Sequence, residues 1–188
     1  MSMRRSYLGL LAAALAVTAS AGCGGSVTTA GTGLAASSPT ATSAVQPSDR
    51  DKTWLRKTHR GNLAEIGAGR LAEQKGTSQQ VKSIGEMLVK DHGELDKQVV
   101  ELAGKLGVKL PEGMSEDQRA QAKKLANASS AQFDREFVTQ MTAAHKVAIA
   151  ATKQEIDRGS SPEVVALAKS ALPALEDHLS LLEKAAGS

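Results

Sequence analysis

Three of the four histidines in the chain stand on apolar stripes of helical spacing, at positions where a large aliphatic residue would be expected. They are His92, His145 and His178, and Glu65 holds a comparable position on another predicted helix. Each lies near the middle of its predicted helix, so in an antiparallel bundle the four side chains would share one layer. Because buried ionisable groups need partners, the layer predicts either a metal site or a metal-free polar network. Three imidazoles and one carboxylate suit a single zinc, iron or manganese ion.

Two aspartates are candidates for orienting the imidazoles. Asp96 follows His92 by one helical turn, whereas Asp91 precedes it directly, and the Asp-His order recurs at His178. A carboxylate that accepts a hydrogen bond from a metal-binding imidazole fixes its tautomer and its orientation. We therefore expect Asp91 and Asp96 to act as outer partners of the metal ligands.

The spacing of these residues does not favour an enzyme. Di-iron bundles use Glu-x-x-His pairs, but Val89 and Leu175 stand three residues before His92 and His178. A ferritin-like oxidoreductase is therefore the least favoured function. The sequence has no Ser-His-Asp pattern, phosphate-binding loop or second cysteine that would indicate another enzyme class. We assign no catalytic residue.

Five helical segments are predicted to position the candidate side chains. Start signals are the capping patterns Thr77 with Gln80 and Ser115 with Gln118, and Ser161 before Pro162. Pro173 should kink the last helix rather than end it, because the apolar spacing continues beyond it. With the glycines that follow three of the segments as stop signals, the helices should cover about 52–75, 77–106, 115–127, 131–158 and 161–185.

These segments predict the fold class. Four are long and amphipathic, and short turns join them into two hairpins. The link between the hairpins, residues 107–130, is long enough to carry the chain back along the bundle, so the second and third long helices would run parallel. We therefore predict an all-α, ferritin-like four-helix bundle with a long crossover that contains the short helix. A composition with only 2% aromatic residues fits this better than a β-sandwich does.

The first 23 residues are predicted to be a signal peptide. Arg4 and Arg5 precede an apolar run from Tyr7 to Ala19, which is shorter than the roughly 20 residues that a membrane-spanning helix needs. The run ends in SAGC, and its Cys23 is the only cysteine of the chain. This ending resembles a bacterial lipobox and predicts lipidation at Cys23, with an ordinary secretory signal as the alternative. The arginine pair also resembles a twin-arginine export signal.

The rest of the chain divides into a tether, residues 24–50, and the bundle domain, residues 51–188. The tether is small, polar and nearly uncharged, as flexible linkers are. We expect an exported protein of the cell envelope, anchored to a membrane by lipid on the periplasmic or extracellular face. Removing Arg4 and Arg5 leaves 21 basic and 20 acidic residues, so the net charge falls from +3 to +1. Without a basic stripe interleaved with aromatics, nucleic-acid binding is not expected.

Several segments together resemble the bacterial envelope family catalogued as domain of unknown function 4142. They are LAEIGAGRLAEQKG (63–76), VKDHGELDKQV (89–99), LGVKLPEGMS (106–115), FDREFVTQM (133–141) with AHK (144–146), and LPALEDHL (172–179). The resemblance covers about residues 52–185 and implies a ferritin-like four-helix bundle, exported and often lipid-anchored. It marks as the family's polar signature Glu65, Asp91, His92, Asp134, His145 and His178. It implies no activity.

Two functions remain open from the sequence. The first is a metal-binding bundle of the cell envelope, with an envelope or stress-related role. The second is a non-enzymatic interaction module tethered to the membrane, in which the histidine layer only specifies the fold. The sequence indicates neither a protein partner nor an oligomeric state.

Overall fold

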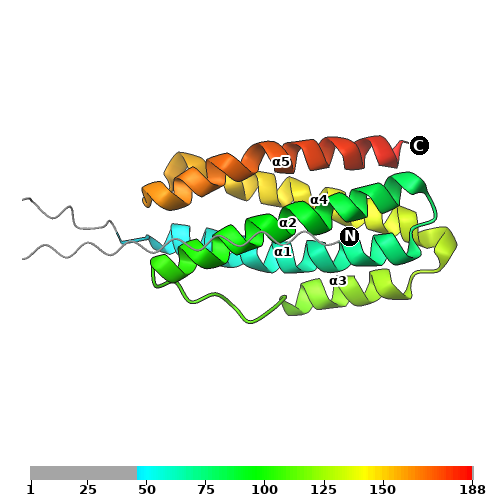
Figure 1. Cartoon of the computed structure of the whole chain (residues 1–188), viewed down its shortest axis with the longest axis horizontal. Coiled ribbons are helices and arrows are strands. Elements are labelled where there is room, and N and C mark those ends of the chain that lie inside the picture. Colours follow the sequence, from blue (N-terminus) through cyan, green and yellow to red (C-terminus); the bar gives the residue numbers. More distant parts are fainter. Residues whose placement is uncertain (1–45, 188) are drawn as a thin grey trace, which may run out of the picture. The chain divides into compact units, whose positions relative to one another are not determined.

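The computed structural model describes residues 46–187, and within them all regular structure is helical. The helices are α1 (Asp49–Lys75), α2 (Gln79–Lys105), α3 (Glu116–Asn127), α4 (Ser130–Arg158) and α5 (Pro162–Ala186). The all-α prediction is confirmed (Figure 1). In the described part of the chain no helix is both long and apolar enough to cross a membrane. The predicted signal peptide, Cys23 and nearly all of the tether lie outside the described residues.

The four long helices form two antiparallel hairpins, α1 with α2 and α4 with α5. Between the hairpins, α1 packs on α4 and α2 packs on α5. The crossover runs back along the bundle and includes α3, which lies against α1 and α4 (Figure 1). As a result α2 and α4 run parallel, which is the one-crossover connectivity that the length of the link predicted.

The bundle core consists of two apolar clusters with the predicted polar layer between them. One cluster surrounds the stacked rings of Phe133 and Phe137, and the other surrounds Trp54 and Leu55. Both clusters contain residues from all four long helices. Because apolar residues of α1, α2, α4 and α5 are buried on both sides of the layer, the helices hold its polar side chains away from water.

Local hydrogen bonds correct two of the predicted helix starts. Helix α2 is capped by Ser78, whose hydroxyl accepts a hydrogen bond from Val81 N at 3.2 Å, so the Thr77 capping box was wrong. The hydroxyl of Thr77 instead donates to Asp134 at 2.6 Å. Helix α1 begins at Asp49, before the predicted start, because Ser48 and Asp51 form a capping box that the sequence reading missed.

The two helices of the first hairpin approach closely at a pair of glycines. A Cβ atom on Gly69 would lie 2.7 Å from the carbonyl oxygen of Gly85, and one on Gly85 would lie 2.7 Å from that of Gly69. Any side chain at either position would push the helices apart. This crossing lies within one helical turn of Glu65 on α1 and two turns from His92 on α2, so it helps to set the separation of these two site residues.

Candidate metal centre

The four predicted ligand residues lie together in the middle of the bundle, one from each long helix. Glu65 comes from α1, His92 from α2, His145 from α4 and His178 from α5, and none is more than 4% exposed. The three imidazole rings pack around one another with centroids 5.3–5.5 Å apart. The mid-helix positions in the sequence thus correspond to one layer in space.

Each histidine directs one ring nitrogen away from the centre, toward an oxygen atom. Nδ1 of His92 lies 3.0 Å from Asn62 Oδ1, and Nδ1 of His145 lies 3.0 Å from its own helix, at the carbonyl oxygen of Met141. Nε2 of His178 lies 3.2 Å from Asp91 Oδ2. Carbonyl and carboxylate oxygens only accept hydrogen bonds, so these outer nitrogens carry the hydrogens. In the neutral rings, the lone pairs therefore stand on the inner nitrogens.

The inner nitrogens and the Glu65 carboxylate converge on one point. His92 Nε2 lies 2.7 Å from Glu65 Oε2, and His145 Nε2 lies 3.4 Å from the same oxygen. Nε2 of His145 is also 3.3 Å from Nδ1 of His178. One ligand atom from each of the three histidines lies within 4.8 Å of the other two. The three imidazoles are therefore close enough to bind one metal ion together.

Burial and mutual charge set the protonation of the cluster. Burial alone would raise the pKa of Glu65, but the charge of His92 and its hydrogen bond outweigh burial and hold that pKa below its ordinary value. Burial lowers the pKa of His145, and burial followed by the charge of His92 lowers the pKa of His178. At neutral pH the cluster therefore contains an ionised carboxylate and two neutral imidazoles, the forms that bind metal ions.

A positive charge is required between Glu65 and His92. Without one, an ionised oxygen and a nitrogen lone pair would face each other at 2.7 Å in a buried site. Neither Glu65 Oε2 nor His92 Nε2 has another hydrogen-bonding partner. Either a proton on His92 Nε2 or a metal ion among the four side chains satisfies this requirement.

Two of the separations between donor atoms suit a tetrahedral ion. Ligand atoms about 2.0–2.1 Å from zinc lie about 3.3 Å apart at tetrahedral angles. The separations from His145 Nε2 to Glu65 Oε2 and to His178 Nδ1 are 3.4 and 3.3 Å. The shorter separation between Glu65 and His92, 2.7 Å, is that of a hydrogen bond.

The two aspartates predicted as outer partners have different roles. Asp91 contacts an imidazole of the cluster, but it is that of His178 across the helix interface and not that of its neighbour His92. Asp96 contacts His59 at 2.8 Å, and it reaches His92 only through Asn62. Asp134, the remaining acid of the family signature, caps the start of α2 from α4 and is not part of the cluster.

Sequence reasoning missed Asn62 as a partner of the site. Its Nδ2 donates to Asp96 at 3.4 Å, which orients its Oδ1 toward His92. A signal was present, because Asn62 shares the inner face of α1 with Glu65 one turn away. The carbonyl oxygen of Met141 has no sequence signal beyond being four residues before His145.

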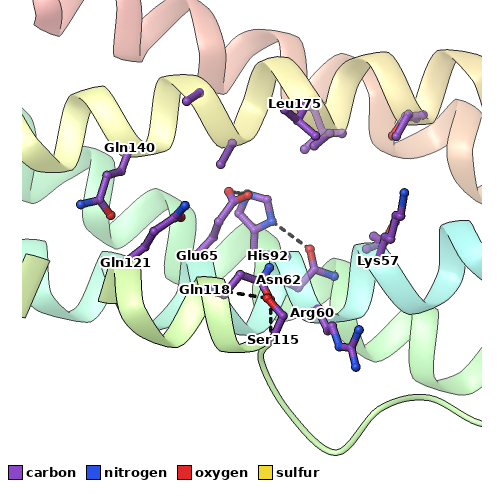
Figure 2. A pocket seen from close by; sticks show the side chains of 18 of the residues that line it. Lys57, Arg60, Asn62, Glu65, His92, Ser115, Gln118, Gln121, Gln140 and Leu175 are labelled. Atoms are coloured by element: carbon purple, nitrogen blue, oxygen red, sulfur yellow. Dashed lines mark hydrogen bonds and ion pairs between the residues drawn. The ribbon is translucent and has the colours of Figure 1, made fainter. Parts of the chain in front are cut away.

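A cavity of about 850 Å³ opens beside the cluster, between α1, α3 and α4. Glu65, Asn62 and His92 line its inner end, whereas His145 and His178 do not line it (Figure 2). Figure 2 also shows Gln121 of α3 and Gln140 of α4 projecting into the space between these helices. The cluster is therefore approached from the side that α3 covers.

A second group of buried acidic side chains, Asp51 and Glu155, lies at the N-terminal end of α1, near the turn between α4 and α5. Asp51 is fully buried and accepts hydrogen bonds from Ser160 N at 3.0 Å and Ser161 N at 3.2 Å. The carboxyl of Glu155 faces Asp51 and has no further hydrogen-bonding partner. Burial, then the hydrogen bond and the charge of Asp51, raise the pKa of Glu155 to about 7. Burial opposes ionisation of Asp51 too, but its hydrogen bonds keep the pKa of Asp51 below its ordinary value.

Comparisons with known proteins support the family and the fold. The family model described as "Domain of unknown function (DUF4142)" matches residues 36–185, which confirms the family that the sequence motifs resembled. No curated protein matches the chain. A crystal structure of a DUF305 fragment from Deinococcus radiodurans is similar at 17% identity and a TM-score of 0.67, over 75% of this chain and 97% of that one.

A second solved structure has the same kind of helical fold. It is described as CopM in the Cu(I)-bound form, with 18% identity and a TM-score of 0.61, over 71% of this chain and 93% of that chain. At these identities both likenesses establish the fold alone.

Proposed function

The chain belongs to the DUF4142 family, whose description records no activity, and we propose that its bundle binds one divalent metal ion through Glu65, His92, His145 and His178. One observation carries the proposal. Every outer nitrogen of the three imidazoles has an oxygen acceptor, so the inner nitrogens of His92 and His145 are directed to the Glu65 carboxylate and that of His178 to His145 Nε2. Fixing the outer nitrogen of each ligating histidine in this way is how proteins usually prepare such sites.

The donor set selects the class of ion. It consists of imidazole nitrogens and a carboxylate oxygen, which suit zinc, iron or manganese, whereas Cu(I) prefers the sulfur of cysteine or methionine. One structural neighbour is described as CopM in the Cu(I)-bound form. For the present chain we propose a divalent ion, with zinc first, because the separations of 3.3 and 3.4 Å suit tetrahedral coordination.

We further propose that the bundle works in the cell envelope, exported and anchored through a lipid on Cys23. The support is the sequence alone: Arg4, Arg5, the apolar run up to Ala19 and the single cysteine that follows. In this location the domain would hold a metal ion close to a membrane surface. The role that we propose there is in the metal or stress response of the envelope.

One observation favours the second function, a tethered interaction module with a purely structural layer. The separation of 2.7 Å between His92 and Glu65 is that of a charge-assisted hydrogen bond. A proton on His92 would satisfy the pair without any ion. On this alternative, replacing both members of the pair (Glu65→Leu with His92→Leu) would keep or raise stability, because a buried ion pair is often replaceable by hydrophobic residues, whereas His92→Leu alone would leave the Glu65 carboxylate buried without its partner.

Zinc titration followed by calorimetry, with elemental analysis of the purified protein, separates the two functions. The metal proposal predicts one zinc ion per chain, with binding abolished in His145→Ala. A control is His59→Ala, because His59 is a partly buried histidine that pairs with Asp96 outside the cluster. Absence of stoichiometric zinc, iron or manganese binding by the folded protein would exclude the metal function and leave the structural one.

A further inference from the structure

The cavity beside the cluster has the features of a ligand site and has not been used in the proposed function. Its volume of about 850 Å³ lies in the range of pockets for small organic molecules. The wall contributed by α4 is lined by small apolar side chains, among them Ala144, Ala148 and Ala151. Val147, on the same wall, is 71% exposed and extends the apolar lining toward solvent.

The polar groups of the cavity are unevenly placed. At the inner end lie Glu65 and His92, whose Oε2 and Nε2 atoms are buried and have no further hydrogen-bonding partner in the described part of the chain. At the outer side lie two cations of α1, Lys57 and Arg60, one turn apart and without a carboxylate partner among the described residues. Asp117 of α3 also lines the cavity, but the two cations outnumber it, so the entrance favours anions. Apolar walls favour a ligand with an apolar body.

The proposed metal site would make the inner end of the cavity positive, which favours a negatively charged ligand. A divalent ion with one carboxylate and three neutral imidazoles leaves a net charge of +1 at the inner end of the cavity. Glu65 and His92 are the two members of the cluster that line the cavity, so this is the side from which a further ligand would approach an ion held by the four side chains. Catalytic zinc sites become five-coordinate in some transition states, so a fifth ligand is compatible with a zinc ion.

We propose that the cavity binds a small organic carboxylate with an apolar body, its carboxylate directed to the metal ion and its apolar body against the alanines of α4. This inference rests on the proposed metal site. Lys57 and Arg60 serve to attract the anion, and α3, which lies along one side of the cavity, limits the size of the ligand.

The experiment uses the purified protein loaded with Co(II), which takes zinc sites and whose visible absorption depends on its coordination number. Acetate and hexanoate are titrated separately. We expect both to change the spectrum, and hexanoate to bind at least about tenfold more tightly, because each methylene that leaves water is favourable by about 0.8 kcal/mol. The fluorescence of Trp54, the only tryptophan and a residue of the cavity wall, should change with hexanoate.

A matched pair of variants tests the place of binding. Ala148→Leu fills part of the cavity and should weaken hexanoate binding about tenfold or more while leaving acetate binding within about twofold. Ala150→Leu makes the same change on an exposed position of α4 outside the cavity and should have no effect. Co(II) binding without any spectral response to either acid would overturn this inference and leave the metal site standing. Failure to bind Co(II) would overturn both, and equal affinities unaffected by Ala148→Leu would overturn the role of the cavity.

Discussion

Replacing Glu155 by glutamine should remove a loss of stability that the bundle undergoes as pH rises from about 4.5 to 7. In the structure, Glu155 is 1% exposed and faces the carboxylate of Asp51, which is held in the ionised form by backbone and hydroxyl hydrogen bonds. Two adjacent buried carboxylates cannot both ionise without cost, so Glu155 retains a proton to higher pH than an exposed glutamate. The nearby charge of Arg50 opposes this effect only in part. A glutamine amide is neutral at every pH and can donate to Asp51 as the protonated carboxyl does.

The sign and size of the effect follow from proton linkage. The pKa of Glu155 is about 7 in the folded state and 4.5 as its ordinary value, so between these pH values the folded protein binds the extra proton. The free energy of unfolding therefore falls as pH rises from 4.5 to 7 and is level above 7. The difference between the two pKa values corresponds to at most about 3 kcal/mol. Relative to the natural protein, Glu155→Gln should gain that amount at pH 8 and almost nothing at about pH 4.5.

Urea denaturation at several pH values between 4.5 and 8, with a chelator present, measures this difference. The chelator prevents metal binding from contributing its own pH dependence. The control is Glu73→Gln, because Glu73 is an exposed glutamate of α1 with no charged partner, and its substitution should show no pH-dependent gain. If Glu155→Gln differed from the natural protein by the same amount at both ends of the range, Glu155 would not carry a raised pKa and the proposed proton sharing would be wrong.

Two further predictions concern the helix crossing and the outer partners of the histidines. Gly69→Ala should destabilise the protein by about 1–3 kcal/mol, because its methyl group would meet the Gly85 carbonyl. The control Gly67→Ala has no atom near its added methyl group and should stabilise the protein by about 0.5–1 kcal/mol. Urea denaturation measures both changes. Asp91→Ala should weaken zinc binding about 10–100-fold in calorimetry, since it removes the acceptor of His178 Nε2, and the exposed Glu94→Ala on the same helix should leave zinc affinity unchanged.

The sequence predicted the helices and the polar layer because both depend on local periodicity. His92 could be assigned to a buried stripe from Leu88 and Val99 alone, since residues at helical spacing share a face whatever the rest of the chain does. The parallel direction of α2 and α4 followed from the length of the crossover, which is also a local property. Placing Glu65 in the same layer required only that each residue be near the middle of its helix.

Partners that come together through the relative register of the helices could not be predicted. Asp51 meets Ser160 and Ser161 across 109 and 110 residues of sequence, and Thr77 meets Asp134 across 57. Each contact depends on how far one hairpin is shifted along the other, and a shift of one turn is about 5.4 Å. The same dependence on register explains why the partner of Asp91 was not predicted. Its neighbour in sequence is His92, but the imidazole that it contacts is that of His178.

The polar layer itself supplies a physical reason for one particular register. The first hairpin contributes Glu65 and His92, the second contributes His145 and His178, and the atoms meet only when both hairpins are docked without a shift. A shift of one turn would place each ionisable group against the apolar clusters on either side and leave it without a partner, at a cost of several kcal/mol. An ion bound to all four side chains would join the two hairpins directly. Metal binding should therefore stabilise the docking of the hairpins more than either hairpin alone, because neither hairpin contains the complete ligand set.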